Sequence, residues 1–207
     1  MTKRLENIYD SENFAIHEIV MPLFEQKRSE TVIDLGAGKG TTTALLKRLG
    51  LNVKACDSNP ALFRPGDIEI KKVNLDEKLP YASNQFDNAL AIEVVEHLEN
   101  PWLFFREVYR IMKKGGTLVI STPNTNSINS RVRYLLFGTL PYFSEHAYRN
   151  IYHVSPIFIW NLRRMIENKF KIKRIFYKNH AIPFTRIMIP FKNALFGEVI
   201  IFELERI

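Results

Sequence analysis

The stretch VIDLGAGKG at residues 32–40 constrains the fold more than any other part of the chain. A short β-branched run, TVIDL, leads into three alternating glycines. TTTALLKRLG follows with the apolar spacing of a helix that ends at Gly50. Glycine tolerates a left-handed backbone and lets a ligand come close to the chain. The order strand, tight loop, helix therefore predicts a βα unit that carries a binding loop.

The same alternation continues along the chain. Helices are expected over 99–116 and 156–168. Strands are expected in seven segments: 31–35, 52–57, 68–75, 86–94, 117–123, 169–178 and 197–207. Such alternation predicts an α/β fold in which helices cover both faces of a mostly parallel sheet. We expect a Rossmann-like, doubly wound sheet of seven strands with an antiparallel last strand, in which the last two strands pair with each other.

A length of 207 residues suits a single domain. We expect that domain to include an N-terminal helix over about 8–28, which Pro22 could kink, and an acceptor-side insertion over about 124–155. No apolar run is long enough for a membrane span, the first residues lack the apolar core of a signal peptide, and Cys56 is the only cysteine. These features favour a cytoplasmic location, with peripheral membrane contact as an alternative.

The glycine loop fits poorly to the common phosphate-binding patterns. A dinucleotide loop has the spacing G-x-G-x-x-G, whereas this chain has G-A-G-K-G and then Thr41. A P-loop requires G-K-[ST], but Lys39 is followed by glycine. We therefore expect the loop to be approached by a group other than phosphate.

The segment DLGAGKG at 34–40 resembles the first motif of class I S-adenosylmethionine-dependent methyltransferases, which reads acidic-x-G-x-G-x-G. Further segments at 55–60, 79–102 and 106–124 resemble, in the same order, signatures of the bacterial subgroup that includes ubiquinone-type O-methyltransferases. The resemblance covers about residues 30–124. It implies an enzyme that uses S-adenosyl-L-methionine as methyl donor and releases S-adenosyl-L-homocysteine.

The resemblance also implies roles for individual side chains at the strand ends. Asp57 would accept hydrogen bonds from both ribose hydroxyls, unless it merely caps the following short helix. Asp34 would orient the methionine part of the cofactor, with a plain turn aspartate as the alternative, and Asn74 or Asp76 would contact adenine. Glu93 would lie at the sulfonium end or be an exposed acid at a helix start. The expected cofactor site comprises Asp34, Gly36, Ala37, Gly38, Gly40, Asp57, Ser58, Asn74, Leu75, Ile92 and Glu93.

Methyl transfer from a sulfonium is an in-line displacement, so the protein mainly has to align the reacting atoms. His97, placed on the same side of a helical turn as Glu93, could act as a base, and is otherwise a hydrogen-bonded structural histidine. Tyr142, His146 and His153 in the insertion could line an acceptor pocket. Because no histidines and carboxylates show a spacing of the HExxH kind, no metal is expected.

The choice of acceptor depends on two apolar segments. Residues 126–138 place Ile128, Val132, Leu135 and Leu136 on one helical face. Residues 181–196 are unusually apolar for a connection, which indicates packing on the domain's own core or, alternatively, contact with a lipid-like substrate or a membrane. We expect a small or lipid-linked acceptor, methylated at oxygen, with peripheral membrane contact. The net charge of +7 is concentrated in the C-terminal part, which leaves methylation of RNA or protein as an alternative. Nucleic acid is disfavoured because a [DN]-P-P-[YFW] motif and an RRM-like module are absent, and a non-catalytic cofactor-binding protein is the third possibility.

Overall fold

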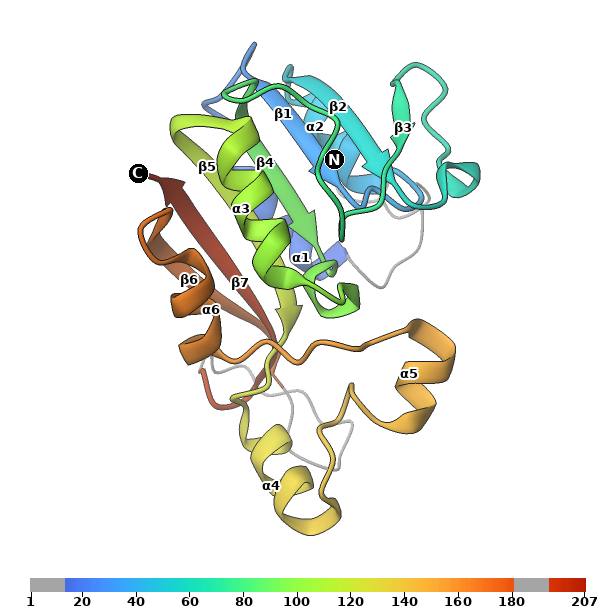
Figure 1. Cartoon of the computed structure of the whole chain (residues 1–207), viewed down its shortest axis with the longest axis vertical. Helices are drawn as coiled ribbons and strands as arrows, with labels where there is room; N and C mark the ends of the chain where they lie inside the picture. Colours follow the sequence, from blue (N-terminus) through green and yellow to red (C-terminus); the bar gives the residue numbers. More distant parts are fainter. Residues whose placement is uncertain (1–13, 181–193) are drawn as a thin grey trace.

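The computed structural model describes residues 14–180 and 194–207, which form a sheet in the order β3-β2-β1-β4-β5-β7-β6 (Figure 1). The first five strands are parallel, and β7 runs antiparallel to both β5 and β6. The strands are β1 (Thr31–Leu35), β2 (Asn52–Asp57), β3 (Ile70–Lys72), β4 (Phe86–Ile92), β5 (Met112–Pro123), β6 (Phe170–His180) and β7 (Gly197–Arg206). This confirms the expected seven-stranded, mostly parallel α/β fold.

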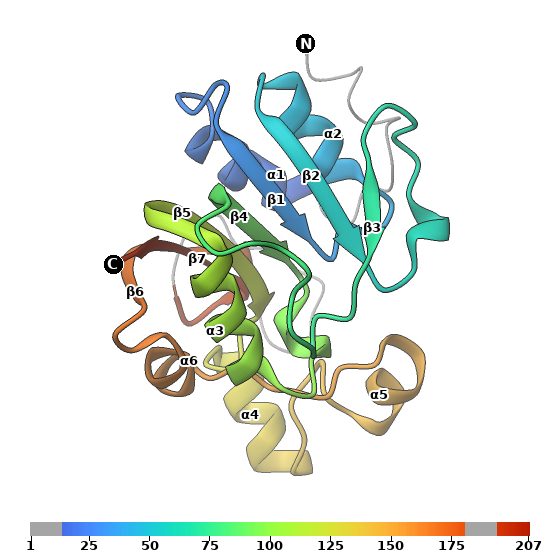
Figure 2. The same ribbon diagram turned by 45° about the horizontal axis from the view of Figure 1, so that its top comes forward.

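Helices cover both faces of the sheet, as Figures 1 and 2 show. On one face lie α1 (Phe14–Val20) and α2 (Thr41–Arg48), and on the other lie α3 (Pro101–Ile111) and α6 (Ile159–Ile166). Side chains alternate between the two cores along each strand. Val119 packs with α1 and α2, whereas its neighbours Leu118 and Ile120 pack with α3 and α6. The sheet is therefore buried on both sides, as parallel sheets usually are.

Several elements differ in extent from the sequence predictions. The helix expected over 99–116 ends at Ile111, because the chain from Met112 pairs with β4, and at Gly116 a Cβ would lie 2.2 Å from the carbonyl oxygen of Asp87. The strand expected over 68–75 is only three residues long. The N-terminal helix is described as α1 followed by a short 3₁₀ helix, η3 (Met21–Leu23), so the α-helix ends just before Pro22. Residues 8–13 of that prediction lie outside the described residues.

The segment between β5 and α6 contains α4 (Ile128–Phe137) and α5 (Glu145–Ile151), which lie beyond the carboxyl ends of the parallel strands (Figures 1 and 2). Each helix begins at a serine whose hydroxyl accepts a backbone N–H, Ser127 for α4 and Ser144 for α5. At the start of this segment the N–H of Asn124 donates to the carbonyl of Glu198 in β7. Capped helices anchored at the end of a strand cover the sheet edge where a ligand of this fold class binds.

Within residues 14–180 and 194–207, no helix is long and apolar enough to cross a membrane. The apolar segment 181–196 falls almost entirely outside these ranges, so its expected packing on the core, or contact with a lipid-like substrate or a membrane, stays a prediction.

Candidate functional site

The glycine loop follows β1 directly at the carboxyl edge of the sheet, and Gly36, Gly38 and Gly40 all have positive φ. The surroundings of the first two differ. A Cβ at Gly36 would lie 2.5 Å from Cγ2 of Val94, so the protein's own packing requires glycine there. At Gly38 no described atom lies within 4 Å of the Cβ position. The loop therefore leaves open space at Gly38, where a ligand could approach the backbone.

The N–H groups of the loop are already bonded within the protein. Those of Gly36 and Ala37 donate to the carbonyl oxygen of Cys56 at 2.9 and 3.0 Å, and that of Gly38 donates to Oδ2 of Asp57 at 2.8 Å. A phosphate-binding loop needs such donors to point at its ligand. These three donors are used, which agrees with the expectation that the loop binds something other than phosphate.

Asp57 is the last residue of β2, and each of its carboxylate oxygens accepts a hydrogen bond from a backbone N–H. Its Oδ1 accepts the N–H of Asn59 at 2.8 Å, just before the 3₁₀ helix η4 (Pro60–Leu62), so the alternative reading as a local cap describes part of its role. Its Oδ2 holds Gly38. A carboxylate has about four acceptor sites, and two remain for ribose hydroxyls. Ser58, the next residue, is exposed.

Asp34 lies in β1, is almost fully buried, and accepts a hydrogen bond of 2.6 Å from Oγ1 of Thr43 in α2. Burial raises the pKa of Asp34 to about 6, and the hydrogen bond from Thr43 opposes part of that rise. The side chain thus ties the glycine loop to the helix behind it. Its contact with the methionine part of the cofactor stays a prediction.

The two candidates for the adenine contact both have partners in the structure. Asn74 is exposed, donates to Oε1 of Glu77 and accepts the N–H of Asp76. Asp76 accepts the N–H of Asn100, the N-cap of α3, at 2.7 Å. Leu75, between them, is buried. Asp76 therefore positions α3, and Asn74 is the more exposed of the two.

Glu93 follows β4 directly with a left-handed backbone, φ 53°, after the nearly buried Ile92. Its N–H donates to Oγ of Ser121, and that hydroxyl donates to Oε1 of Glu93 at 2.6 Å. Burial raises the pKa of this carboxyl. Glu93 is thus not an exposed acid at a helix start. The expected helical turn shared with His97 is also wrong, because η5 (Val95–His97) begins only after Glu93.

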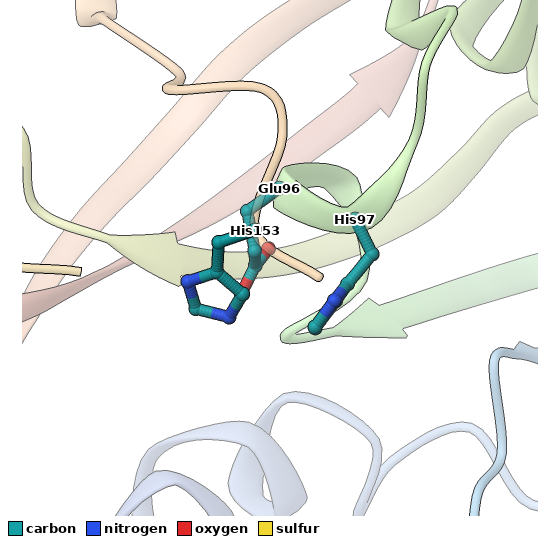
Figure 3. A group of neighbouring side chains, drawn as sticks. All are labelled: Glu96, His97 and His153. Atoms are coloured by element: carbon teal, nitrogen blue, oxygen red, sulfur yellow. The ribbon is translucent and has the colours of Figure 1, made fainter. Parts of the chain in front are cut away.

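Glu96, His97 and His153 come together beside this strand end, with one potential ligand atom from each residue within 4.8 Å of the others (Figure 3). Glu96 is 0% exposed, and neither carboxylate oxygen has a hydrogen-bond partner among the residues that the structure describes. The imidazole rings of His97 and His153 pack edge to face, with centroids 4.6 Å apart. Short sequence spacings, from which no metal is expected, do not reveal this group, because it combines positions far apart in the chain.

Backbone hydrogen bonds explain how His153 reaches η5. The N–H groups of Val154 and Ser155 both donate to the carbonyl oxygen of Glu96, at 2.9 and 3.0 Å. The hydroxyl of Ser155 donates to the carbonyl of Leu98, and the phenol of Tyr152 donates to Glu99. The end of the insertion is thereby fixed along η5, and His153 lies over Glu96.

The electrostatics of this group follow from its burial. Burial lowers the pKa of both His97 and His153, which favours neutral imidazoles at neutral pH. Burial, together with the nearby charge of Glu93, raises the pKa of Glu96 well above its ordinary value. A carboxyl group and two neutral imidazoles therefore share a site where proton transfer or metal binding is chemically accessible.

The other predicted acceptor residues are placed differently. Tyr142 donates a 2.6 Å hydrogen bond to Oε2 of Glu198 in β7, and its backbone carbonyl lies 2.9 Å from Nδ1 of His153. Tyr142 therefore supports the group indirectly. His146 is exposed on α5 and contacts Asn150 in the same helix. The structure does not bring His146 into the group with His97 and His153.

A family model described as a methyltransferase domain matches residues 9–155. The chain belongs to this family. The matched range contains both the glycine loop and His153, so the methyltransferase domain includes the two parts of the site described above.

Relatives extend the comparison over part of the chain. The sequence is 31% identical over 112 residues to the mitochondrial ubiquinone biosynthesis O-methyltransferase of Rattus norvegicus, a match to 47% of this chain and 32% of that protein. It is 28% identical over 103 residues to the ubiquinone biosynthesis O-methyltransferase of Caulobacter vibrioides, 45% of this chain and 41% of that protein. The chain spans less than half the length of these curated relatives.

Solved structures share the fold over nearly the whole methyltransferase chain. A SAM-dependent methyltransferase from Archaeoglobus fulgidus superposes with a TM-score of 0.70 at 21% identity, covering 93% of this chain and 92% of that one. An S-adenosylmethionine-dependent methyltransferase from Mesorhizobium loti gives a TM-score of 0.63 at 15% identity, covering 94% and 99%. The family and the fold together imply S-adenosylmethionine as the methyl donor.

Proposed function

We propose that this chain transfers a methyl group from S-adenosylmethionine to an oxygen of a small or lipid-linked acceptor. The observation that carries the proposal is the juxtaposition, at one edge of the sheet, of a glycine loop with open space at Gly38 and a group formed by Glu96, His97 and His153. Transfer from a sulfonium requires donor and acceptor side by side. The loop and the group provide two neighbouring sites for them.

The residues on the donor side suit a nucleoside that carries no phosphate. Asp57 keeps acceptor capacity for two hydroxyls while it holds Gly38, and the N–H groups that a phosphate would need are bonded elsewhere. S-adenosylmethionine would supply an activated methyl group in such a site. The protein residues would bind its sugar and orient its tail.

The acceptor side supports transfer to oxygen. A hydroxyl acceptor becomes a better nucleophile when it loses its proton, and neutral imidazoles beside a buried carboxyl are suited to promote that loss. The partial similarity to two O-methyltransferases points the same way. We therefore propose that the group of Glu96, His97 and His153 promotes loss of the acceptor proton.

An exposed apolar run on α4 supports an apolar or lipid-linked acceptor. Tyr134, Leu135, Leu136 and Phe137 are each more than 60% exposed, and Leu135 reaches 82%. Contiguous exposed apolar side chains indicate contact with an apolar partner. Arg131, which is exposed on the same helix, would suit an anionic headgroup beside it.

Two measurements test this function. Calorimetric titration should show binding of S-adenosylmethionine and S-adenosylhomocysteine, and NAD serves as the control that should not bind. Transfer of a radiolabelled methyl group should then occur to a catechol, and more efficiently to a phenol that carries a prenyl chain. A chain that binds neither sulfur nucleoside would refute the function, whereas methylation only of RNA or protein would refute the acceptor class.

A further inference from the structure

We propose that Glu96, His97 and His153 bind one divalent transition-metal ion. The ion would activate the acceptor hydroxyl, and this role rests on the function proposed above. The binding site itself is inferred from the geometry alone. One ligand atom from each residue lies within 4.8 Å of the others (Figure 3). Ligand atoms around a tetrahedral Zn²⁺ lie about 3.3 Å apart, given metal–ligand distances of about 2.0–2.1 Å. The three ligand atoms would therefore have to approach one another by at most about 1.5 Å to bind one ion.

Glu96 provides independent support for this site. A buried carboxylate whose two oxygens lack partners is unfavourable, and buried polar groups in folded proteins are nearly always bonded. Among the described residues, neither oxygen of Glu96 has a partner, and the side chain is fully buried next to the two imidazoles. A bound cation would satisfy both oxygens and balance the charge. The position of Glu96 is thus explained by an ion.

The two histidines are oriented as metal ligands usually are. Nδ1 of His97 lies 3.3 Å from the carbonyl oxygen of Tyr152, and Nδ1 of His153 lies 2.9 Å from that of Tyr142. A carbonyl can only accept, so the proton belongs on Nδ1 in each ring, and the lone pair of Nε2 is available. Histidines that bind metals commonly donate their other N–H in this way, which fixes the ring. The insertion therefore supplies one ligand and orients both.

The ligand set selects the class of ion. Two imidazoles and one carboxylate suit Zn²⁺, Co²⁺, Mn²⁺ or Fe²⁺ and leave coordination positions open. Mg²⁺ and Ca²⁺ prefer oxygen ligands. We infer a transition ion of the first group rather than an alkaline-earth ion.

An open coordination position explains how the acceptor would react. A hydroxyl oxygen bound to the ion would have a lowered pKa and would release its proton to water. Its lone pair would form the bond to the methyl carbon while the carbon–sulfur bond breaks. The electrons of that bond would pass to the sulfur, which gives S-adenosylhomocysteine. His97 and His153 would then act as ligands and not as bases.

The test uses the full chain after treatment with a chelator. Titration with Co²⁺, followed by calorimetry and visible absorption, should show one ion per chain and the spectrum of nitrogen and oxygen ligation. Zn²⁺ should compete for the same site. Mg²⁺ should bind much more weakly than Co²⁺, and the reverse order would overturn the assigned ion class.

Variants locate the site. His153→Asn and Glu96→Gln should each weaken Co²⁺ binding by at least about 100-fold, whereas His146→Asn, at an exposed histidine of α5, should bind as the wild type does. Far-ultraviolet circular dichroism checks that each variant is folded. If Glu96→Gln does not fold, His153→Asn still tests the site. A wild-type chain that binds no Co²⁺, or variants that bind it equally well, would refute the site. A chain that binds Co²⁺ but not S-adenosylmethionine would refute only the methyltransferase function.

Discussion

The two halves of the candidate site are built in opposite ways. On the donor side, the loop donors are bonded to Cys56 and Asp57, and an unfilled space remains at Gly38. On the acceptor side, a buried carboxylate lacks partners among the described residues, and two imidazoles are held by backbone carbonyls. The donor side is thus complete as a protein structure and needs only a ligand that fits its shape. The acceptor side is electrostatically incomplete without an added group.

The largest effect is expected from filling the space on the donor side. In Gly38→Val, the new side chain would occupy the open space and disfavour the left-handed backbone, φ 52°. Binding of S-adenosylmethionine should fall at least about 100-fold while the fold is kept. Gly115→Val is the matched control, because its φ is 79° and no described atom lies within 4 Å of its Cβ position. Equal affinities of the two variants, measured by calorimetry, would mean that the loop does not hold the donor.

A smaller loss is expected when Asp57 is shortened. Asp57→Ala removes the acceptor of the Gly38 N–H and the proposed acceptor of the ribose hydroxyls. Hydrogen bonds to charged groups contribute roughly 1.5–3 kcal/mol, so the affinity for S-adenosylmethionine should fall about 10- to 100-fold. Asp67→Ala, an exposed aspartate paired with Lys47, should leave the affinity unchanged. If Asp57→Ala bound as tightly as the control, ribose recognition would have to be assigned elsewhere.

The burial of Asp34 predicts a dependence of stability on pH. Its pKa is about 6 in the folded chain, above the ordinary value of 3.8, so the folded state binds the proton more tightly than the unfolded state does. The contribution of protonated Asp34 to the stability of the folded state is complete below about pH 4. It is lost as the pH rises through 6. Relative to Asp34→Asn, the wild type should lose up to about 3 kcal/mol between pH 4 and 7. Urea denaturation at several pH values measures this difference, and a constant difference would contradict it.

The smallest effect is expected from the exposed helix of the insertion. Leu135→Glu should leave the melting temperature nearly unchanged, because surface substitutions alter stability by about 0.5 kcal/mol or less. Transfer to a prenylated phenol in vesicles should fall several-fold, and transfer to a soluble catechol should not. Ile207→Glu, at an exposed apolar residue of the C-terminus, is the control. Equal losses with both acceptors would argue against an apolar surface for the acceptor.

The fold was predictable because its signals are local. The run TVIDL, the glycines and the following helix are contiguous, so each βα unit could be identified from a short segment. The limits of the elements were harder to predict. The helix predicted over 99–116 is too long, because the sequence pattern does not show that Met112 already pairs with β4. The left-handed backbone of Glu93 likewise has no signature in the sequence.

The acceptor side illustrates what the sequence does not show. His153 reaches Glu96 only because Val154 and Ser155 bond to the carbonyl of Glu96, a pairing that no spacing rule contains. One signal was present: Glu96 interrupts the apolar run VVEHL, and a carboxylate there must be buried or must distort the turn. Its partner could be found only in three dimensions.

The anchoring of the insertion at both ends has an evolutionary consequence. At one end Asn124 is bonded to Glu198, and at the other Val154 is bonded to Glu96. Because both bonds use backbone N–H groups and carbonyls, they do not depend on the side chains between them. The residues between Asn124 and Val154 could therefore change together during evolution. Such a change would alter the choice of acceptor and leave the glycine loop and its contacts unchanged.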